Sequence, residues 1–277
     1  MATNEVALVT GGNKGIGREI VRRLAQRNFT VYLGARDPER GHSAVEELRQ
    51  ESATSVESTE EPAGVGDDPG RSGDGLDIRF VRLDVTDPES VQAAIRQIDT
   101  ETGRLDVLVN NAGIMAEWGV RTADVTAAHL REVYEVNVFG VVTVTSACLP
   151  MLRRSRNPRI VNMSSGLGSL TLLGDPASPL STRGFLAYSS SKAALNALTL
   201  LYANALRGDG IKVNAASPGL VPTDQNAPAT FPRGDRTTAD GAVVPVLLAT
   251  IPTDGPTGVF RGPDSLASGF HRAMGRE

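Results

Sequence analysis

The chain has 277 residues, of which 40% are hydrophobic and 22% charged, and its formal net charge is −4. This composition is typical of a soluble globular protein, and the slight acidity gives no electrostatic footprint for nucleic acid or an anionic membrane. There is no apolar run near the roughly 18 residues of a membrane span and no basic stretch before an apolar one at the N-terminus, so we expect a cytoplasmic protein without a nucleic-acid or membrane partner.

Apolar, β-branched runs alternate with helical patterns along the chain. The runs predicted as strands are 6–10, 29–35, 78–85, 105–110, 159–164 and 211–217. The segments predicted as helices are 16–27, 38–51, 88–102, 126–153, 187–207 and 238–249. Nearly continuous apolar runs are typical of strands buried on both faces. The alternation predicts one α/β domain over 1–277, with a Rossmann-type, doubly wound parallel sheet of about seven strands between helices.

The first predicted strand leads into the glycine-rich stretch VTGGNKGIG at residues 9–17. At such a strand-to-helix turn, the unpaired N–H groups and the dipole of the helix favour an anion, and glycine leaves room for a pyrophosphate. Gly11, Gly15 and Gly17 form a GxxxGxG pattern, and no GK[ST] follows, which excludes a Walker loop. The stretch by itself does not separate a nucleotide site from an ordinary turn.

The end of the second predicted strand indicates which nucleotide such a site would take. A site for an unphosphorylated ribose normally ends this strand with an acid that accepts from the 2′-OH. Here Ala35 occupies that position, Arg36 follows, and Asp37 is better explained as the N-cap of the next helix. The Arg36 guanidinium and the Lys14 ammonium are suited to a 2′-phosphate. These residues favour NADP over NAD, although either cation could also be an ordinary surface residue.

Two irregular segments interrupt the alternation of strands and helices. Residues 52–76 are rich in Ser, Gly, Pro and acid, and are predicted to be a disordered insertion. Residues 218–236 contain more Pro and apolar residues, and are interpreted as a substrate lid rather than a passive connection.

The single cysteine, Cys148, excludes an intrachain disulfide and is expected in the core.

The candidate reacting groups lie in YSSSK, on a predicted helix. The spacing places Tyr188 and Lys192 on one face. A free phenol has a pKa of about 10, and a nearby ammonium would lower it and make Tyr188 a proton donor for carbonyl reduction. Ser165 follows the fifth strand, where ligands bind in such folds, and could bond a substrate carbonyl. Asn137 lies among apolar neighbours, and could order a water linked to Lys192 or serve in a structural polar network.

Two further stretches end predicted strands near the expected nucleotide. NNAG at 110–113 has small residues that suit close backbone approach. Asp84, at the end of the third strand, could accept from the adenine amino group or simply cap the strand end.

Six motifs occur in order: TGGNKGIG, NNAG, VNVFG, NMSS, YSSSK and SPGLVPTD. Together they resemble the short-chain dehydrogenase/reductase family over essentially the whole chain, and the N-terminal part resembles its carbonyl-reductase branch. The resemblance implies a catalytic tetrad of Asn137, Ser165, Tyr188 and Lys192, with Tyr188 as the proton donor and Lys192 bonding the nicotinamide ribose. No metal site is predicted. The residues expected to contact NADP(H) are Gly11, Asn13, Lys14, Gly15, Ile16, Gly17, Arg36, Asp84, Val85, Asn111, Ala112, Gly113, Tyr188, Lys192, Pro218, Gly219, Val221 and Thr223.

The chain departs from the family pattern between Ser165 and Tyr188, which lie farther apart than usual. The extra stretch, LLGDPASPLSTRG, resembles a shorter form of an insertion in monomeric carbonyl reductases. In most family members the YxxxK helix helps to build an oligomer interface. The sequence therefore leaves both a homodimer and a monomer open.

The resulting prediction is reversible NADPH-dependent reduction of a small-molecule ketone or aldehyde to an alcohol. The alternatives are a non-catalytic NADP(H) sensor and an epimerase or other reaction on the same fold. The pocket is expected to be apolar, shaped by the segment 218–236 and by Met115, Trp118, Leu167 and Gly168.

Overall fold

Seven parallel strands form one sheet in the computed structural model, which describes residues 4–57, 75–182 and 185–263. The strand order is β3-β2-β1-β4-β5-β6-β7, and every neighbouring pair is parallel. The strands are β1 (Val6–Thr10), β2 (Thr30–Ala35), β3 (Ile78–Arg82), β4 (Val107–Asn110), β5 (Arg159–Met163), β6 (Lys212–Ala216) and β7 (Phe260–Arg261). The expected doubly wound parallel sheet is thus confirmed. The short strand β7 was not among the predicted runs.

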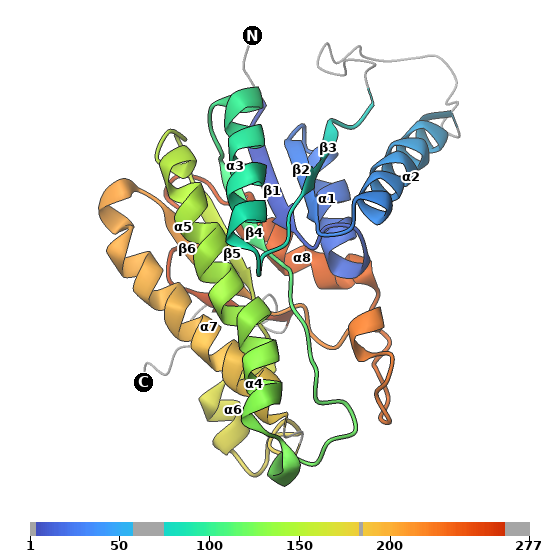
Figure 1. Cartoon of the computed structure of the whole chain (residues 1–277), viewed down its shortest axis with the longest axis vertical. Helices are drawn as coiled ribbons and strands as arrows, with labels where there is room; N and C mark the ends of the chain where they lie inside the picture. The colour runs from blue at the N-terminus through green and yellow to red at the C-terminus, as the bar shows by residue number, and fades with distance from the viewer. Residues whose placement is uncertain (1–3, 58–74, 183–184, 264–277) are drawn as a thin grey trace.

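Helices cover both faces of the sheet (Figure 1). The main helices are α1 (Gly15–Ala25), α2 (Pro38–Glu57), α3 (Pro88–Thr102), α4 (Ala127–Tyr134), α5 (Val141–Leu152), α7 (Leu186–Ala205) and α8 (Thr238–Ala249), and a short α6 spans Leu170–Gly174. Buried side chains of α1, α2 and α8 form one apolar cluster, and those of α3 and α5, with the C-terminal end of α7, form the other. The two clusters lie on opposite faces of the sheet, so the sequence of buried strands produces a three-layer α/β/α fold.

Strand β1 shows why a strand that is buried on both faces has an uninterrupted apolar sequence. Ala7 and Val9 pack into the cluster with α1, whereas Val6 and Leu8 pack into the cluster with α3. Alternate side chains of a strand point to opposite faces, and here both faces are covered. An uninterrupted apolar run is the result. Cys148 is completely buried among the α3-side residues, as expected.

The expected disorder of 52–76 is wrong at its start. Helix α2 continues to Glu57, six residues beyond the predicted end, because Ser, Ala, Val and Glu at 52–57 still allow helical backbone. Leu76, at the other end, packs against the core cluster that contains α2. Residues 58–74 lie outside the described part of the chain.

The predicted helix 126–153 is one continuous helical segment with an irregular middle. Between α4 and α5, residues Glu135–Gly140 form a π-helical turn that contains Asn137. The stretch Ala127–Leu152 is long and apolar enough to cross a membrane by length and composition, but half of its most apolar window is buried inside the fold. It packs on α3 and α7, as a core helix of a globular domain does.

The carboxyl edge of the sheet is where the functional candidates meet. β1 pairs with β2 on one side and with β4 on the other, so the chain reverses its direction of travel across the sheet at β1. In open α/β sheets this reversal leaves a crevice beyond the carboxyl ends of the strands, where ligands bind.

Candidate active site

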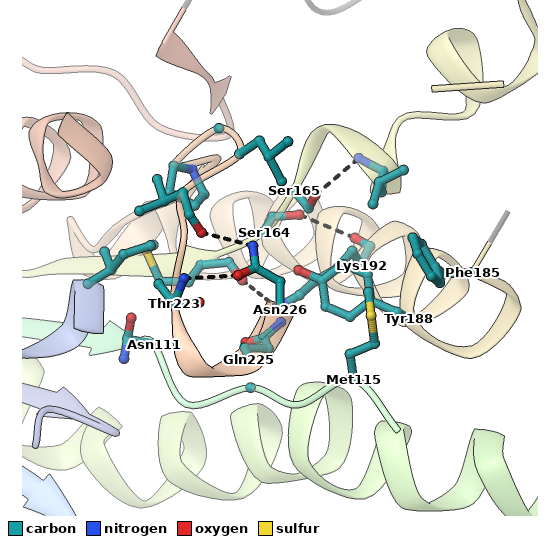
Figure 2. A pocket seen from close by; sticks show the side chains of 18 of the residues that line it. Asn111, Met115, Ser164, Ser165, Phe185, Tyr188, Lys192, Thr223, Gln225 and Asn226 are labelled. Carbon is teal, nitrogen blue, oxygen red and sulfur yellow. Dashed lines mark hydrogen bonds between the residues drawn. The ribbon is translucent and has the colours of Figure 1, made fainter. Parts of the chain in front are cut away.

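A pocket opens beyond the carboxyl ends of β1, β4, β5 and β6, and it brings together residues from most of the predicted motifs (Figure 2). Of the predicted catalytic groups, Ser165, Tyr188 and Lys192 line it. The predicted cofactor-contacting residues among its walls are Ile16, Asn111, Gly113, Pro218, Gly219, Val221 and Thr223. Met115, Trp118 and Leu167 also line it, but Gly168 does not, because it packs tightly on the Lys192 backbone.

Ser165 and Tyr188 converge although the sequence separates them. Ser165 follows β5 in extended conformation, and its Oγ accepts a hydrogen bond from Leu167 N at 3.2 Å. Its side chain also hydrogen-bonds Tyr188, which partly offsets the burial that raises the pKa of the Tyr188 phenol. The neighbouring Ser164 is turned away: its Oγ donates to Asn196 at 2.6 Å. Of the two serines, Ser165 is therefore the one whose side chain hydrogen-bonds Tyr188.

Lys192 is buried below Tyr188, one helical turn along α7. Its Nζ donates to Met163 O at 2.7 Å and lies 5.5 Å from the centre of the Tyr188 ring. Burial lowers the pKa of Lys192 to about 8. The expectation that this ammonium lowers the pKa of Tyr188 is wrong, because burial of the phenol dominates and raises that pKa. A raised pKa keeps Tyr188 protonated at neutral pH, which is the form that can donate a proton.

Asn137 does not line the pocket but lies behind it, completely buried. Its Nδ2 donates to Ile114 O and to Ser191 Oγ, both at 3.0 Å, and its Oδ1 accepts from Ile114 N at 2.8 Å. The amide therefore ties the loop after β4 to α7. A Cβ at Gly113 would lie 3.3 Å from Asn137 Oδ1 and 3.4 Å from Lys192 Nζ. Both polar atoms therefore lie next to Gly113, and a larger residue there would crowd them. The predicted water link between them stays a prediction.

The glycine loop leaves the first turn of α1 open toward the pocket. Lys14 is the N-cap residue and its side chain makes no capping hydrogen bond. Gly15 has a φ of +55°, which favours glycine, and a Cβ there would find only Thr223 within 4 Å. This cradle fits a phosphate group at a helix N-terminus.

Gly11 and Gly17 both lie against Asn111, which belongs to the loop after β4. A Cβ at Gly17 would lie 2.4 Å from both Asn111 Nδ2 and Gly11 O. That same Asn111 Nδ2 donates to Thr10 O and Gly11 O, at 2.9 and 3.1 Å. These hydrogen bonds join the glycine loop to the NNAG stretch, 100 residues away in the sequence. The missing side chain of Gly17 leaves the space that the Asn111 amide occupies.

Gly17→Ala is expected to destabilise the protein by about 1–3 kcal/mol, because the added methyl displaces either the Asn111 amide or the Gly11 carbonyl. Gly208→Ala is the matched control, since a Cβ at Gly208 meets nothing within 4 Å. Its effect should stay within about 0.5 kcal/mol. Urea unfolding of both variants measures the difference, and equal stabilities would contradict the packing role of Gly17.

The predicted selector residues lie at the end of β2. Ala35 is buried in the core cluster and offers no polar group, and Arg36 beside it is exposed. Asp37 caps α2 as expected, because its Oδ1 accepts from Glu39 N and Arg40 N at 3.0 and 3.2 Å. Lys14 is engaged in an exposed ion pair with Asp224 at 2.9 Å, a partner that sequence reasoning did not find.

The remaining predicted cofactor residues are placed as follows. Asn111 N and Ala112 N both donate to Thr10 Oγ1 at 3.0 Å, so β1 fixes the start of the loop after β4. Asp84 accepts from Thr86 N and Thr86 Oγ1 through Oδ1, as in a turn that caps a strand end. Val85 packs against Gly140. Asn13 is partly buried in the glycine loop.

The segment 218–236 crosses the pocket and brings residues that sequence reasoning did not identify. Gln225 reaches Tyr188 and lowers its pKa by hydrogen bonding, against the larger effect of burial. Phe231 lines the pocket near Trp118, with ring centres 6.3 Å apart. Asn226 holds the turn together, because its Oδ1 accepts from Thr223 N and its Nδ2 donates to Val221 O. Figure 2 shows Gln225 and Tyr188 close together in the pocket.

Glu117 is another residue that no sequence pattern marks as functional. It is 1% exposed, and its two carboxylate oxygens accept from Ala187 N and Tyr188 N at 2.9 and 2.8 Å. These N–H groups belong to the first turn of α7, which has no side-chain cap of its own. A carboxylate there satisfies unpaired donors and complements the helix dipole. Glu117 therefore fixes the helical turn that carries Tyr188.

Glu117→Ala is expected to cost about 2 kcal/mol of stability, because two buried N–H groups lose a charged acceptor. We also expect a fall in kcat of roughly tenfold, since a small displacement of Tyr188 weakens catalysis. Glu117→Gln keeps one acceptor and should recover part of both losses. Glu132→Ala, at an exposed glutamate of α4, is the control. Thermal unfolding and kcat measure the effects, and a Glu117→Ala enzyme with parental kcat would contradict the positioning role.

Comparisons with known proteins agree with this geometry. The family model described as short chain dehydrogenase matches residues 5–61 and 60–232. The chain is 32% identical to (+)-neomenthol dehydrogenase of Capsicum annuum, covering 92% of this chain and 94% of the relative. It is also 32% identical to salutaridine reductase of Papaver somniferum, covering 92% and 93%. The solved structure of that reductase covers 93% of this chain and 99% of its own, with a TM-score of 0.71 at 30% identity.

The match spans most of the chain, and the pocket contains the motif residues in one place. This chain belongs to the short-chain dehydrogenase family and is an oxidoreductase that uses a nicotinamide cofactor.

Proposed function

We propose that the protein reduces a ketone or aldehyde to an alcohol with NADPH, and that the reaction is reversible. The observation that carries this proposal is the convergence of Ser165, Tyr188 and Lys192 on one pocket beside the open N-terminus of α1. Relatives that share about a third of the sequence bear the names of a dehydrogenase of neomenthol and a reductase of salutaridine.

In this proposal the side chains supply the proton and hold the carbonyl group. Tyr188 donates its phenolic proton to the carbonyl oxygen, and the Ser165 hydroxyl donates a hydrogen bond to the same oxygen. Ser165 and Gln225, which hydrogen-bond the phenol, favour the phenolate that remains on Tyr188, and Lys192 would hold the cofactor ribose. Asn137 and Glu117 keep the loop after β4 and the first turn of α7 in place through their buried hydrogen bonds.

The residues around the glycine loop fit a nicotinamide dinucleotide. Gly15 and the first turn of α1 would hold the pyrophosphate, and Ile16, Val221 and Thr223 line the path from there into the pocket. Arg36 would hold the 2′-phosphate that distinguishes NADP from NAD. When bound, the cofactor supplies the hydride that is added to the carbonyl carbon. The segment 218–236 would act as the lid that excludes water from this step.

The test is a panel of uncharged ketones and aldehydes with NADPH, followed as the loss of absorbance of the reduced nicotinamide. We expect turnover with several members and formation of the corresponding alcohols, with much weaker activity when NADH replaces NADPH. Purified, folded protein that binds NADPH but reduces no member of a broad panel would contradict the proposal and favour a cofactor-binding sensor.

A further inference from the structure

The inner pocket is almost free of charge. Among the described residues that line it, the only charged side chain is Lys192, and its Nζ is bonded to Met163 O at 2.7 Å. The walls are otherwise made of apolar groups, small residues and uncharged amides and hydroxyls. An ammonium on the substrate would lose its hydration there with no counter-charge, and a carboxylate or phosphate would meet only Lys192, whose Nζ already donates to Met163 O. The substrate portion that enters this pocket is therefore uncharged.

Three aromatic rings from three separate segments meet on the wall of this pocket. Trp118 comes from the loop after β4, Phe185 precedes the first turn of α7, and Phe231 belongs to the segment 218–236. The ring centres lie 5.4 Å apart for Trp118 and Phe185, and 6.3 Å apart for each of the other two pairs. We call these residues the aromatic wall. Since neighbouring rings are already in contact, a ligand packs against this wall rather than between its rings.

The aromatic wall stands next to the reacting groups. Phe185 is three residues before Tyr188, and both residues line the same pocket together with Met115 (Figure 2). Met115 and Leu167 extend the apolar lining. Aromatic rings prefer aromatic partners in offset or edge-to-face contact, and a methionine sulfur adds a favourable contact at a ring edge. A saturated ring of the same size gains neither.

We propose that the aromatic wall is a subsite for an uncharged aryl group, so that the substrate is an aryl-bearing ketone or aldehyde whose carbonyl reaches Ser165 and Tyr188. This inference rests on the proposed carbonyl reduction and names its substrate class. The ring of the substrate lies against Trp118, Phe185 and Phe231, and the link between ring and carbonyl passes Met115.

The decisive probes are two methyl ketones that differ only in the ring. 4-Phenylbutan-2-one and 4-cyclohexylbutan-2-one have the same linker, so neither ring is conjugated to the carbonyl and intrinsic reactivity is matched. The cyclohexyl compound is the more hydrophobic, so burial alone would favour it. We expect kcat/KM with NADPH to be about 3- to 10-fold higher for the phenyl compound. A para-carboxylate on the phenyl ring should reduce kcat/KM by at least about 100-fold.

Leucine variants test which residues create the preference. Trp118→Leu, Phe185→Leu and Phe231→Leu should each move the phenyl-to-cyclohexyl ratio toward one, mainly through KM for the ketone. Phe139→Leu is the matched control, because Phe139 is 52% exposed and lies outside the pocket. It should leave the ratio unchanged. A parent enzyme that shows no phenyl preference, or a ratio that survives all three substitutions, would overturn the proposal.

A binding measurement separates this proposal from the proposed reaction. Trp118 is the single tryptophan of the chain, so its fluorescence reports on the aromatic wall directly. With oxidised NADP bound, a ketone cannot be reduced, and 4-phenylbutan-2-one should change the Trp118 emission in a saturable manner at lower concentration than its cyclohexyl partner. If the fluorescence preference is present but no ketone is reduced, the subsite stands and the reaction fails. If ketones are reduced without any preference in rate or fluorescence, the reaction stands and the subsite fails.

Discussion

Replacement of Tyr188 by phenylalanine is expected to lower the rate of ketone reduction by about 10²- to 10⁴-fold, the usual contribution of a positioned proton donor. The phenol lines the pocket, and burial raises its pKa, so it carries its proton at neutral pH. Ser165 and Gln225 hydrogen-bond to it and favour the phenolate that forms when the proton leaves. Phenylalanine keeps the ring and the backbone N–H that donates to Glu117, so only the hydroxyl with its transferable proton is lost. The measurement is single-turnover reduction with saturating NADPH.

A control variant and a cofactor-binding measurement show whether the lower rate comes from the lost proton donor rather than from a disturbed structure. Tyr202→Phe removes a hydroxyl from the same helix, where Tyr202 packs against the α3-side core away from the pocket, and should leave the rate nearly unchanged. NADPH binding, followed by the fluorescence of the reduced nicotinamide, should change by less than about threefold in Tyr188→Phe, because the ring still fills its place. A Tyr188→Phe enzyme that retains parental turnover would remove Tyr188 from the mechanism.

The sheet and the meeting of the motifs could be predicted because both follow from local patterns. Buried parallel strands are uninterrupted apolar runs, and the carboxyl ends of such strands share one edge. Residues after β1, β4, β5 and β6 must therefore come close, whatever their separation in the sequence. Ser165, Tyr188 and Lys192 were found in this way, from position relative to a strand or from spacing along a helix.

The contacts that support these groups could not be predicted, because they join irregular segments. Glu117 lies in a loop where no periodicity marks a buried carboxylate, and its partners are 70 and 71 residues away. Gln225 and Phe231 depend on the path of the segment 218–236. Spacing also placed Lys192 beside Tyr188 without indicating that its ammonium would bond Met163 O. Spacing also does not show how deeply the Tyr188 phenol is buried, and this burial raises its pKa where the sequence predicts a lowered one.

Replacement of Arg36 by alanine is expected to reduce the preference for NADPH over NADH by roughly 10- to 100-fold, the loss that follows when a phosphate loses a charged hydrogen-bond donor. Arg36 is exposed at the end of β2, beside a buried Ala35 that offers no acceptor to a ribose hydroxyl, and Asp37 is occupied in capping α2. The effect should appear in KM for NADPH and leave kcat/KM for NADH nearly unchanged. Steady-state kinetics with both cofactors measure it. Arg207→Ala removes an exposed arginine from the turn before β6, which lies across the sheet from β2, and should change neither value.

Lys14 is expected to contribute less than Arg36, because its ammonium is already paired with Asp224. Both side chains of that pair are more than half exposed, so the pair itself is weak and a phosphate can compete for Lys14. Asp224→Asn should therefore lower KM for NADPH modestly, and the gain should disappear in a Lys14→Ala background. Added salt should weaken NADPH binding in the parent more than in Arg36→Ala, because the variant has one fewer positive charge whose attraction to the phosphate salt can screen. Equal kcat/KM for NADH and NADPH in the parent enzyme would show that the 2′-phosphate is not recognised. That result would refute the role assigned to Arg36 and Lys14.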